Sequence, residues 1–162
     1  MQHIIHFRRL LAILAVLAVT ALSTQLPAQA QEDKRASRAE AQAMVKKAVE
    51  FYMKNGREKA FAEFSRNPGP FIDRDLYIVV YTLQGEPLVH INPKMVGKSM
   101  IDMRDPDGKY YIRERMEAAA KGGSGWQNYK FFNPVSKKIE PKEMYWEKHD
   151  KLVFACGAYK AL

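Results

Sequence analysis

The segment 97–116, GKSMIDMRDPDGKYYIRERM, brings together two Gly-Lys pairs and three aspartates, which are residue types that bind phosphate groups or metal ions. A phosphate-binding loop has the pattern Gly-x-x-x-x-Gly-Lys-Ser/Thr between a strand and a helix, so that amides at the helix N-terminus hold the phosphates. Gly97-Lys98-Ser99 supplies only the last three letters, because Asn92 stands five residues before Gly97, and no helical pattern begins at Ser99. The segment is therefore not predicted to bind a nucleotide.

A calcium loop of the EF-hand type is the second chemistry that these aspartates suggest. Such a loop has acidic residues at positions 1, 3 and 5, glycine at position 6 and glutamate at position 12. Asp105, Asp107, Gly108 and Glu114 fit the later positions, but Met103 occupies the first, and a thioether is a poor calcium ligand. We interpret DPDG as a tight turn, with the Asp107 carboxylate accepting amide hydrogen bonds near the start of the next helix.

The other reactive residue types form no pattern for catalysis or metal binding. The single cysteine, Cys156, lies in the apolar run KLVFACGAY, where a buried and unreactive thiol is expected. His149 and Asp150 lie in a turn without a neighbouring nucleophile. His90 and His149 are far apart in the sequence and have no cysteine partner, so no metal site is predicted. An enzyme is the least favoured function class, and no cofactor is expected.

The elements that position these residues follow from hydrophobic periodicity. Ser37 and Glu40 form a capping-box pattern, and apolar residues recur at helical spacing up to Asn55-Gly56, which predicts a helix of about five turns. Further helices are expected at 57–65 and 109–121. Strands are expected at 76–83, 88–92, 125–132, 143–149 and 151–159. This order predicts a single α+β domain with a five-stranded, mostly antiparallel sheet, in which the strand 76–83 is covered on both faces because both are apolar.

The first thirty residues have the character of a targeting segment. A pair of arginines precedes the apolar run 10–22, and Ala28-Gln29-Ala30 offers small residues for cleavage. Residues 1–30 are therefore predicted to be a secretory signal peptide, cleaved near Ala30-Gln31, and residues 31–162 to form one periplasmic domain. The apolar run is shorter than the roughly 20 residues of a membrane-spanning helix, although retention as an anchor stays open.

The basic character of the chain does not indicate nucleic-acid binding. The 162 residues include 26 Lys and Arg against 18 Asp and Glu, a formal net charge of +8. Basic and acidic residues are interleaved, as in EDKRASRAE and YIRERMEAAAK, which is typical of solvated helix faces rather than of an arm that follows a phosphate backbone. No nucleic-acid partner is expected.

The order of elements and a set of short motifs resemble the single Cache domains of type 2, which are extracytoplasmic sensor modules of bacterial chemoreceptors and histidine kinases. The resemblance covers nearly all of the mature chain and depends on the motifs in combination, because each alone is weak. These motifs are His90 with Asn92-Pro93, Gly97-Lys98, Asp105-Pro106-Asp107-Gly108-Lys109, Gly125-Trp126, Tyr129, Asn133-Pro134, Glu140-Pro141-Lys142, Tyr145 and Gly157-x-Tyr159. Lys130 departs from the family, which often has Arg there, and a lysine offers a point charge in place of a bidentate fork.

The resemblance implies a PAS-like fold, in which a long N-terminal helix lies along an antiparallel sheet and the other face, with the intervening loop and helix, encloses a small pocket. It also implies a small-molecule ligand, which in the family is usually an organic acid or a related metabolite. An aromatic wall with one or two donors suits such an acid, since an unpaired buried charge is costly. The expected ligand-binding residues are Tyr81, His90, Trp126, Tyr129, Lys130, Lys142 and Tyr145.

Each of these side chains also suits a plain structural role, with the rings and His90 packed in a core and the lysines in solvent. Because side chains alternate along a strand, Tyr129 and Lys130 line one pocket only if a bulge lies between them. The predicted function is a stand-alone exported domain that binds an organic acid for sensing, with a membrane receptor or kinase reading the bound form, or that buffers the ligand. The alternative is a structural protein with a filled pocket that acts as a homodimer through its N-terminal helix.

Overall fold

The computed structural model describes residues 35–160, so the predicted signal peptide and its cleavage point lie outside the described residues. The elements of the described part follow the predicted order, with two very short strands in addition. They are α2 (Arg38–Asn55), α3 (Arg57–Ser65), β1 (Ile72–Asp73), β2 (Leu76–Tyr77), β3 (Val79–Thr82), β4 (Pro87–Val89), the 3-10 helix η1 (Pro93–Met95), α4 (Tyr111–Ala120), β5 (Ser124–Phe132), β6 (Ile139–His149) and β7 (Leu152–Tyr159).

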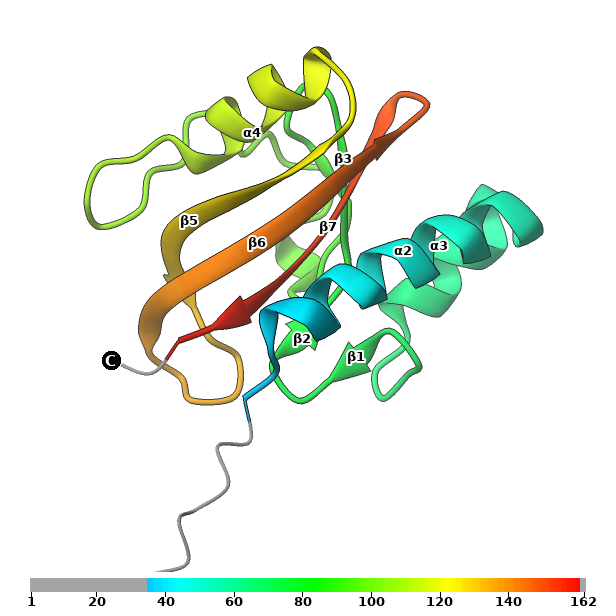
Figure 1. Ribbon diagram of the computed structural model, residues 1–162, viewed down its shortest axis with the longest axis horizontal. Helices are drawn as coiled ribbons and strands as arrows, with labels where there is room; N and C mark the ends of the chain where they lie inside the picture. The colour runs from blue at the N-terminus through cyan, green and yellow to red at the C-terminus, as the bar shows by residue number, and fades with distance from the viewer. Residues whose placement is uncertain (1–34, 161–162) are drawn as a thin grey trace, which may run out of the picture. The chain divides into compact units, whose positions relative to one another are not determined.

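A five-stranded antiparallel sheet in the order β4-β3-β7-β6-β5 is the centre of the domain, which confirms the predicted α+β class (Figure 1). The central strand β7 is buried along its whole length. The expected strand 76–83 is divided at Ile78 into β2, which pairs with β1, and β3, which lies between β4 and β7. Strands β5 and β6 pair without a register shift, so no bulge lies between Tyr129 and Lys130.

Helix α2 covers one face of the sheet, and its start is fixed by local hydrogen bonds. Ser37 Oγ accepts a hydrogen bond from the Glu40 amide at 3.2 Å, and Glu40 Oε2 accepts one from the Ser37 amide at 2.7 Å, which is the predicted capping box. The helix ends at Gly56, whose φ of 77° suits glycine. The apolar side of α2 packs with α3 on a core of aliphatic and aromatic residues and the buried thiol of Cys156.

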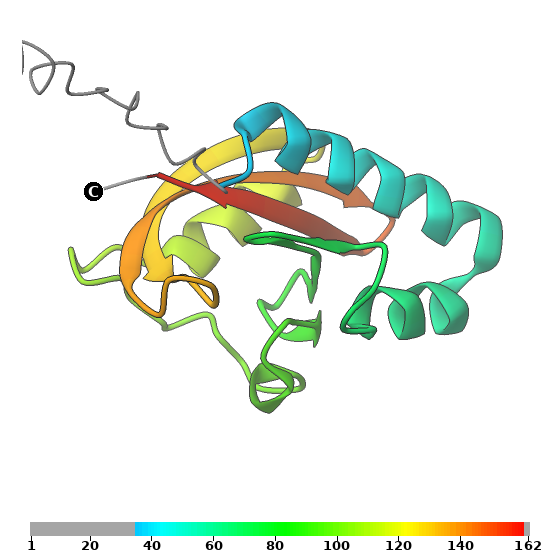
Figure 2. The same ribbon diagram turned by 90° about the horizontal axis from the view of Figure 1, so that it is seen from below.

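The opposite face of the sheet is covered by the segment 93–120, which we call the lid and which ends in helix α4. In Figure 2, helix α2 lies along one side of the sheet and the loops that follow β4 lie on the other. The turn between β3 and β4 holds the lid in place, because the Met100 amide donates to the Gly85 carbonyl at 3.0 Å and the Gly97 amide to the Pro87 carbonyl at 2.9 Å. A Cβ atom on Gly85 would lie 2.9 Å from Ile112 of α4, so this close approach requires glycine.

The DPDG turn within the lid is organised by Asp105. The prediction of a tight turn is confirmed, but the prediction that Asp107 accepts the amide hydrogen bonds is wrong. Asp105 Oδ1 accepts from the amides of Asp107 and Lys109 at 3.0 and 2.9 Å, and its Oδ2 accepts from the amide of Lys130 on β5 at 3.1 Å. Helix α4 then begins at Tyr111, two residues later than expected and without a side-chain cap. The turn therefore fastens the lid to the edge of the sheet.

Candidate functional site

Arg115 projects from α4 toward the sheet and is 1% exposed. Its Nε atom donates to Gln127 Oε1 at 3.1 Å. Both terminal nitrogens are buried and make no hydrogen bond of good geometry among the described residues, although the phenols of Tyr81 and Tyr129 interact with the guanidinium. The faces of two phenol rings flank the guanidinium, with Cζ 5.6 Å from the centroid of Tyr81 and 5.3 Å from that of Tyr129. Such cation–π contacts compensate part of the burial cost. They leave the fork of the guanidinium available for a carboxylate, which it binds with two parallel hydrogen bonds.

Lys142 projects from β6 toward the same side and is also 1% exposed. Its Nζ atom donates to the hydroxyls of Tyr77 and Tyr159 at 3.0 and 3.2 Å, and it lies 4.1 and 4.3 Å from the centroids of these rings. Tyr159 donates in turn to the Phe132 carbonyl at 2.7 Å. A Cβ atom on Gly157 would lie 2.8 Å from Lys142 Cε, so glycine in the adjacent strand leaves room for the lysine stem.

Neither cation has a carboxylate within ion-pair distance among residues 35–160. Burial lowers the pKa of Lys142 to about 7, and the charge of Arg115 acts in the same direction. Burial raises the pKa of Tyr77 and of Tyr129, so both phenols stay neutral at pH 7. We call the group Arg115, Lys142, Tyr77, Tyr81, Tyr129 and Tyr159 the cationic cluster. The buried carboxylate of Asp75, which accepts from the amides of Ala36 and Tyr159, raises the pKa of Lys142 but lies beyond ion-pair distance.

Aromatic rings connect the two cations. Tyr111 stacks on Tyr129 with the ring centroids 4.4 Å apart and the planes inclined by 10°. Phe131 lies next to this pair, 6.0 Å from the centroid of Tyr129, and its own centroid is 5.9 Å from Lys142 Nζ. An aromatic wall with a few convergent polar groups is typical of a small-molecule site.

His90 stands beside the cluster at the end of β4. Its Nδ1 atom accepts a hydrogen bond from the Asn92 amide at 2.9 Å, and its ring centroid lies 5.8 Å from that of Tyr77. Burial, together with the charge of Lys142, lowers the pKa of His90 to about 4, so the imidazole is neutral at pH 7. His90 therefore adds a polar group but no charge to the site.

Two surface pockets reach the cationic cluster from different sides. One, of about 360 Å³, has Arg115 and Gln127 in its wall, between α4 and the edge of the sheet. The other, of about 540 Å³, lies between the segment after β4 and the tip of the β5–β6 hairpin, and Tyr77 and His90 are its least exposed lining residues. We call the second the apolar groove, because most of its lining is apolar. Arg115 thus lines a pocket itself, whereas Tyr77 stands between the apolar groove and Lys142.

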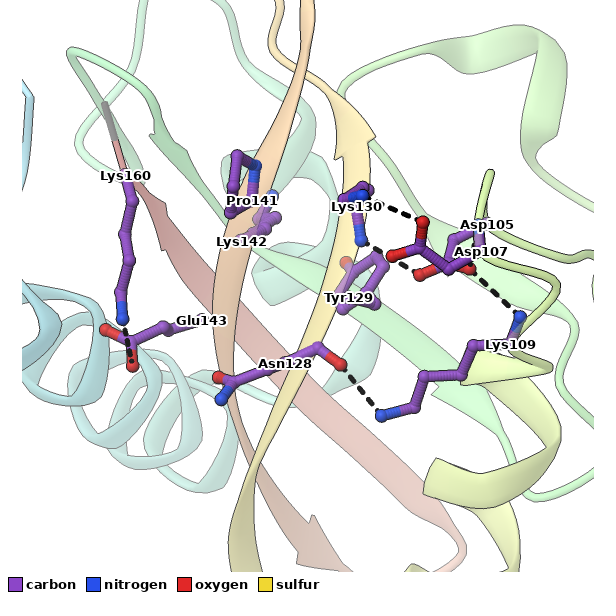
Figure 3. Close-up of a pocket in the computed structure, with 10 residues that line it drawn as sticks. All are labelled: Asp105, Asp107, Lys109, Asn128, Tyr129, Lys130, Pro141, Lys142, Glu143 and Lys160. Atoms are coloured by element: carbon purple, nitrogen blue, oxygen red, sulfur yellow. Dashed lines mark hydrogen bonds and ion pairs between the residues drawn. The ribbon is translucent and has the colours of Figure 1, made fainter. Parts of the chain in front are cut away.

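A third pocket, of about 290 Å³, lies across β5 and β6 next to the DPDG turn, and we call it the outer pocket (Figure 3). Its exposed lysines all have partners. Lys130 Nζ lies 2.8 Å from Asp107 Oδ1, Lys109 Nζ donates to the Asn128 carbonyl at 2.8 Å, and Lys160 Nζ lies 3.0 Å from a Glu143 carboxylate oxygen. These three lysines are engaged in local structure. Tyr129 and Lys142 of the cationic cluster also line this pocket, so the outer pocket adjoins the cluster (Figure 3).

The structure brings together four of the expected ligand-binding residues: Tyr81, Tyr129 and Lys142 lie in the cationic cluster, and His90 lies beside it. Trp126 and Tyr145 are cross-strand neighbours on the face covered by α2, where Arg38 lies over the Trp126 ring at 4.1 Å. At the edge of the sheet, Trp126 also lines the pocket that contains Arg115. Lys130 lines the outer pocket. Strand alternation predicts this separation onto two faces of the sheet, because Trp126 and Tyr129 are an odd number of residues apart, and so are Lys142 and Tyr145.

Sequence reasoning did not single out Arg115, Tyr77, Tyr111 or Tyr159 as site residues. For Arg115 the signal was available, since it stands three residues after Ile112 and four before Ala119, inside the apolar stripe of the helix that was predicted. A charged residue at such a position must be buried on the sheet, where it needs a partner. For Tyr77 the signal was its position on the same strand face as Tyr81.

Other kinds of site are not indicated within residues 35–160. No group of three or more His, Cys, Asp or Glu side chains there is placed to hold a metal ion. Burial raises the pKa of Cys156 to about 12, which makes its thiol a poor nucleophile. Among the described helices, none is both long enough and apolar enough to cross a membrane.

The fold, with a long helix on one face of an antiparallel sheet and a lid on the other, is that of the PAS-like sensor domains. The family model "Single Cache domain 2" matches residues 14–156, and the chain belongs to this family, whose members are ligand-binding sensor domains. A methyl-accepting chemotaxis protein from Vibrio parahaemolyticus RIMD 2210633 has a similar structure, with a TM-score of 0.66 and 23% identity over 75% of this chain and 86% of that one.

Two further comparisons give the same fold or family. A Cache chemosensory domain described for its recognition of carboxylic acids matches with a TM-score of 0.59 and 19% identity over 76% of this chain and 88% of that one. The sensor histidine kinase MctS of Rhizobium johnstonii (strain DSM 114642 / LMG 32736 / 3841) is 33% identical over 85 residues, which are 52% of this chain and 18% of the kinase. The chain thus spans less than a fifth of the length of this relative.

Proposed function

We propose that this protein is an extracytoplasmic sensing domain that binds a small organic acid at the cationic cluster. The observation that carries the proposal is the pair of fully buried cations, Arg115 and Lys142, without an acidic partner among the described residues. A buried charge without a counter-charge is costly, so such an arrangement persists where a ligand supplies the counter-charge. A carboxylate supplies it, together with oxygen atoms that match the free nitrogens of Arg115.

The neighbouring groups agree with a carboxylate ligand rather than with catalysis. Tyr81 and Tyr129 form the wall beside Arg115, and the hydroxyls of Tyr77 and Tyr159 hold Lys142. With their pKa values raised, Tyr77 and Tyr129 are donors that keep their protons at pH 7. Recognition of carboxylic acids by a Cache domain of similar fold also supports the proposal. We include Tyr81, His90, Tyr129 and Lys142 among the ligand contacts and add Arg115.

Transmission of the bound state is a further part of the proposal. Members of this family form the sensing part of chemotaxis proteins and of a histidine kinase, among the relatives described above. The lid could transmit ligand binding to the rest of the domain by two contacts. Helix α4 of the lid carries Arg115, and Asp105 fastens the DPDG turn of the lid to β5. We propose that ligand contact with Arg115 fixes α4 on the sheet and that a receptor or kinase partner reads this state. The predicted export of the chain places the site outside the cytoplasm.

The test is a calorimetric titration of the protein with acetate, propionate, lactate, pyruvate and succinate, together with thermal unfolding in the same acids. A ligand at 100 times its dissociation constant is expected to add about 2.7 kcal/mol to the free energy of unfolding. Arg115→Met is expected to weaken binding by at least about thirtyfold, because truncating one member of a buried charge pair costs about 2–5 kcal/mol. Lys142→Met is expected to act in the same direction.

Lys130→Met is the matched control, because it removes a cation from a neighbouring strand on the opposite face. It is expected to leave the affinity unchanged. Arg115→Lys keeps the charge but removes the fork, so an intermediate affinity would show that bidentate geometry matters. If no acid binds or stabilises the protein, while all variants remain folded by circular dichroism, the proposed function is wrong and the filled-pocket alternative replaces it.

A further inference from the structure

The apolar groove adjoins the cationic cluster and has a different lining. Its walls include Ile91 and Met95 from the start of the lid and Phe131 and Phe132 from β5. Phe132 is 48% exposed. Together with two prolines, these residues give the groove an apolar wall open to solvent, at a volume within the range of small-molecule sites.

The deep end of the groove is formed by side chains that contact one of the buried cations, Lys142. Tyr77 lines the groove, and its hydroxyl accepts the hydrogen bond from Lys142 Nζ at 3.0 Å. Phe131 also lines the groove, and its ring centroid lies 5.9 Å from the same nitrogen. His90 stands between these two rings, 5.8 Å from the centroid of Tyr77 and 6.3 Å from that of Phe131. One layer of side chains therefore separates the apolar walls from a positive charge without an acidic partner.

This juxtaposition defines an amphiphilic site, with positive charge at the inner end and apolar surface toward the opening. Apolar surface left in water is unfavourable, and covering it with a methylene group contributes favourably to binding. A ligand with a carboxylate alone would neutralise Lys142 but leave the walls formed by Ile91, Met95 and Phe132 exposed. A ligand with an apolar tail would satisfy both ends.

We propose that the apolar groove is a subsite for the alkyl or aryl tail of the ligand, so that the preferred ligands are monocarboxylates with an apolar substituent rather than acids of the size of acetate. The carboxylate lies at the cationic cluster, within reach of Lys142, and the tail extends past Tyr77 and Phe131 toward Phe132. This inference rests on the proposed function, because it takes the cluster as the site of the carboxylate.

The test is a calorimetric series of straight-chain acids from acetate to octanoate, each titrated into the full protein at a pH below the Lys142 pKa of about 7. The affinity is expected to increase about threefold to fourfold for each added methylene group, until the tail exceeds the groove. Phenylacetate is expected to bind more tightly than acetate for the same reason.

Phe132→Ser is the variant that separates the two subsites, and Val135→Ser is its matched control. Val135 is 60% exposed on the same hairpin but does not line the groove, so the two substitutions remove similar exposed apolar surface. Phe132→Ser is expected to reduce the gain per methylene and to leave acetate affinity unchanged. Val135→Ser is expected to leave the whole series unchanged.

The outcomes distinguish this inference from the proposed function. If no acid of any length binds, the proposed function fails and the subsite fails with it. If acids bind but acetate and octanoate have equal affinities in the protein and in Phe132→Ser, only the tail subsite is overturned. If the series is flat and Phe132→Ser dissociates a dimer in sedimentation velocity, a second copy of the chain occupies the groove, which also overturns the inference.

Discussion

Lys130 and Lys142 lie on neighbouring strands of one sheet, yet their surroundings are opposite. Lys130 points from β5 into the outer pocket, where it is exposed and paired with Asp107. Lys142 points from β6 into the cationic cluster, where it is buried among phenols and has no acidic partner. A paired surface cation stabilises local structure weakly, whereas a buried cation without an acid costs stability unless a ligand arrives. The comparison separates groups that maintain the fold from groups that we assign to binding.

The largest expected effect tests the structural side of this comparison. Asp105→Ala removes a carboxylate that is 8% exposed and accepts three amide hydrogen bonds, so the amides of Asp107, Lys109 and Lys130 lose their partner. We expect the free energy of unfolding in urea to fall by about 3 kcal/mol. The folded fraction should still bind the acid, since Asp105 lies outside the cationic cluster.

Asp107→Ala is the control for this prediction. Asp107 stands two residues away in the same turn, but its side chain is 62% exposed and pairs only with Lys130. We expect a much smaller loss of stability. Equal losses for the two variants would show that the turn does not depend on Asp105 in particular.

The next largest effect tests the binding residue Arg115, and here we expect the free energy of unfolding to rise instead of fall. In the absence of acid, Arg115→Met replaces a buried cation, whose terminal nitrogens make no hydrogen bond of good geometry among the described residues, by an apolar side chain of similar length. Such replacements of buried charges often stabilise a protein, and we expect a gain of about 2 kcal/mol in urea unfolding. Binding of the acid should be lost in the same variant. A loss of both stability and binding would mean that Arg115 is structural.

A pH titration sharpens the comparison within the cationic cluster itself. Burial lowers the pKa of Lys142 from its ordinary value of 10.5 to about 7 in the folded protein, so above pH 7 it is neutral and must take up a proton to bind a carboxylate. Affinity is therefore expected to fall about tenfold for each pH unit above 7. In the absence of the organic acid, the free energy of unfolding should rise with pH between about 7 and 10.5. In this range the unfolded chain binds more protons than the folded one, because Lys142 is protonated only when unfolded.

The titratable neighbours of Lys142 do not account for these changes of affinity and stability with pH. The pKa of His90 is lowered to about 4, chiefly by burial, and the pKa values of Tyr77 and Tyr159 are raised by burial, so none of them titrates between pH 7 and about 9. Lys142→Met is expected to abolish the fall in affinity along with most of the binding. Isothermal titration from pH 6 to about 9 measures the first slope. A flat profile in the unaltered protein would contradict the assignment of Lys142.

The elements were predictable where their signals are local. Ser37 and Glu40 cap α2 through bonds within one turn. Period-two alternation along the expected strand 76–83 places Tyr77, Val79 and Tyr81 on one face, and in the structure they lie in one cluster. Strand β6 begins at Ile139, earlier than expected, because Pro141 looks like a strand breaker in sequence, although its carbonyl still accepts from the Lys160 amide at 2.9 Å. The pairing of β6 with β5 and β7, which no local window contains, decides this boundary.

The candidate site was only partly predictable, for a physical reason. Alternation assigns side chains on one strand to two faces, but the strand register and the helices decide which face carries the site. Trp126 and Tyr145 therefore had the right residue types for the wall of a pocket, yet α2 covers the face on which they lie. Arg115 reaches the cluster only because the DPDG turn and the Gly85 contact place α4 over the sheet. These contacts join residues that are far apart in sequence.

The smallest expected effect is at Lys130, and it completes the comparison with Lys142. Lys130 Nζ lies 2.8 Å from Asp107, but the two side chains are 42% and 62% exposed, so water and salt screen their attraction. We expect Lys130→Met to leave the free energy of unfolding in urea unchanged within error, at low salt and at high salt alike. The backbone amide of Lys130 keeps its bond to Asp105 in this variant, so the lid stays fastened to β5. A clear loss of acid affinity would place Lys130 among the binding groups, and a clear loss of stability would show that its ion pair supports the fold; either result would remove the distinction between Lys130 and Lys142.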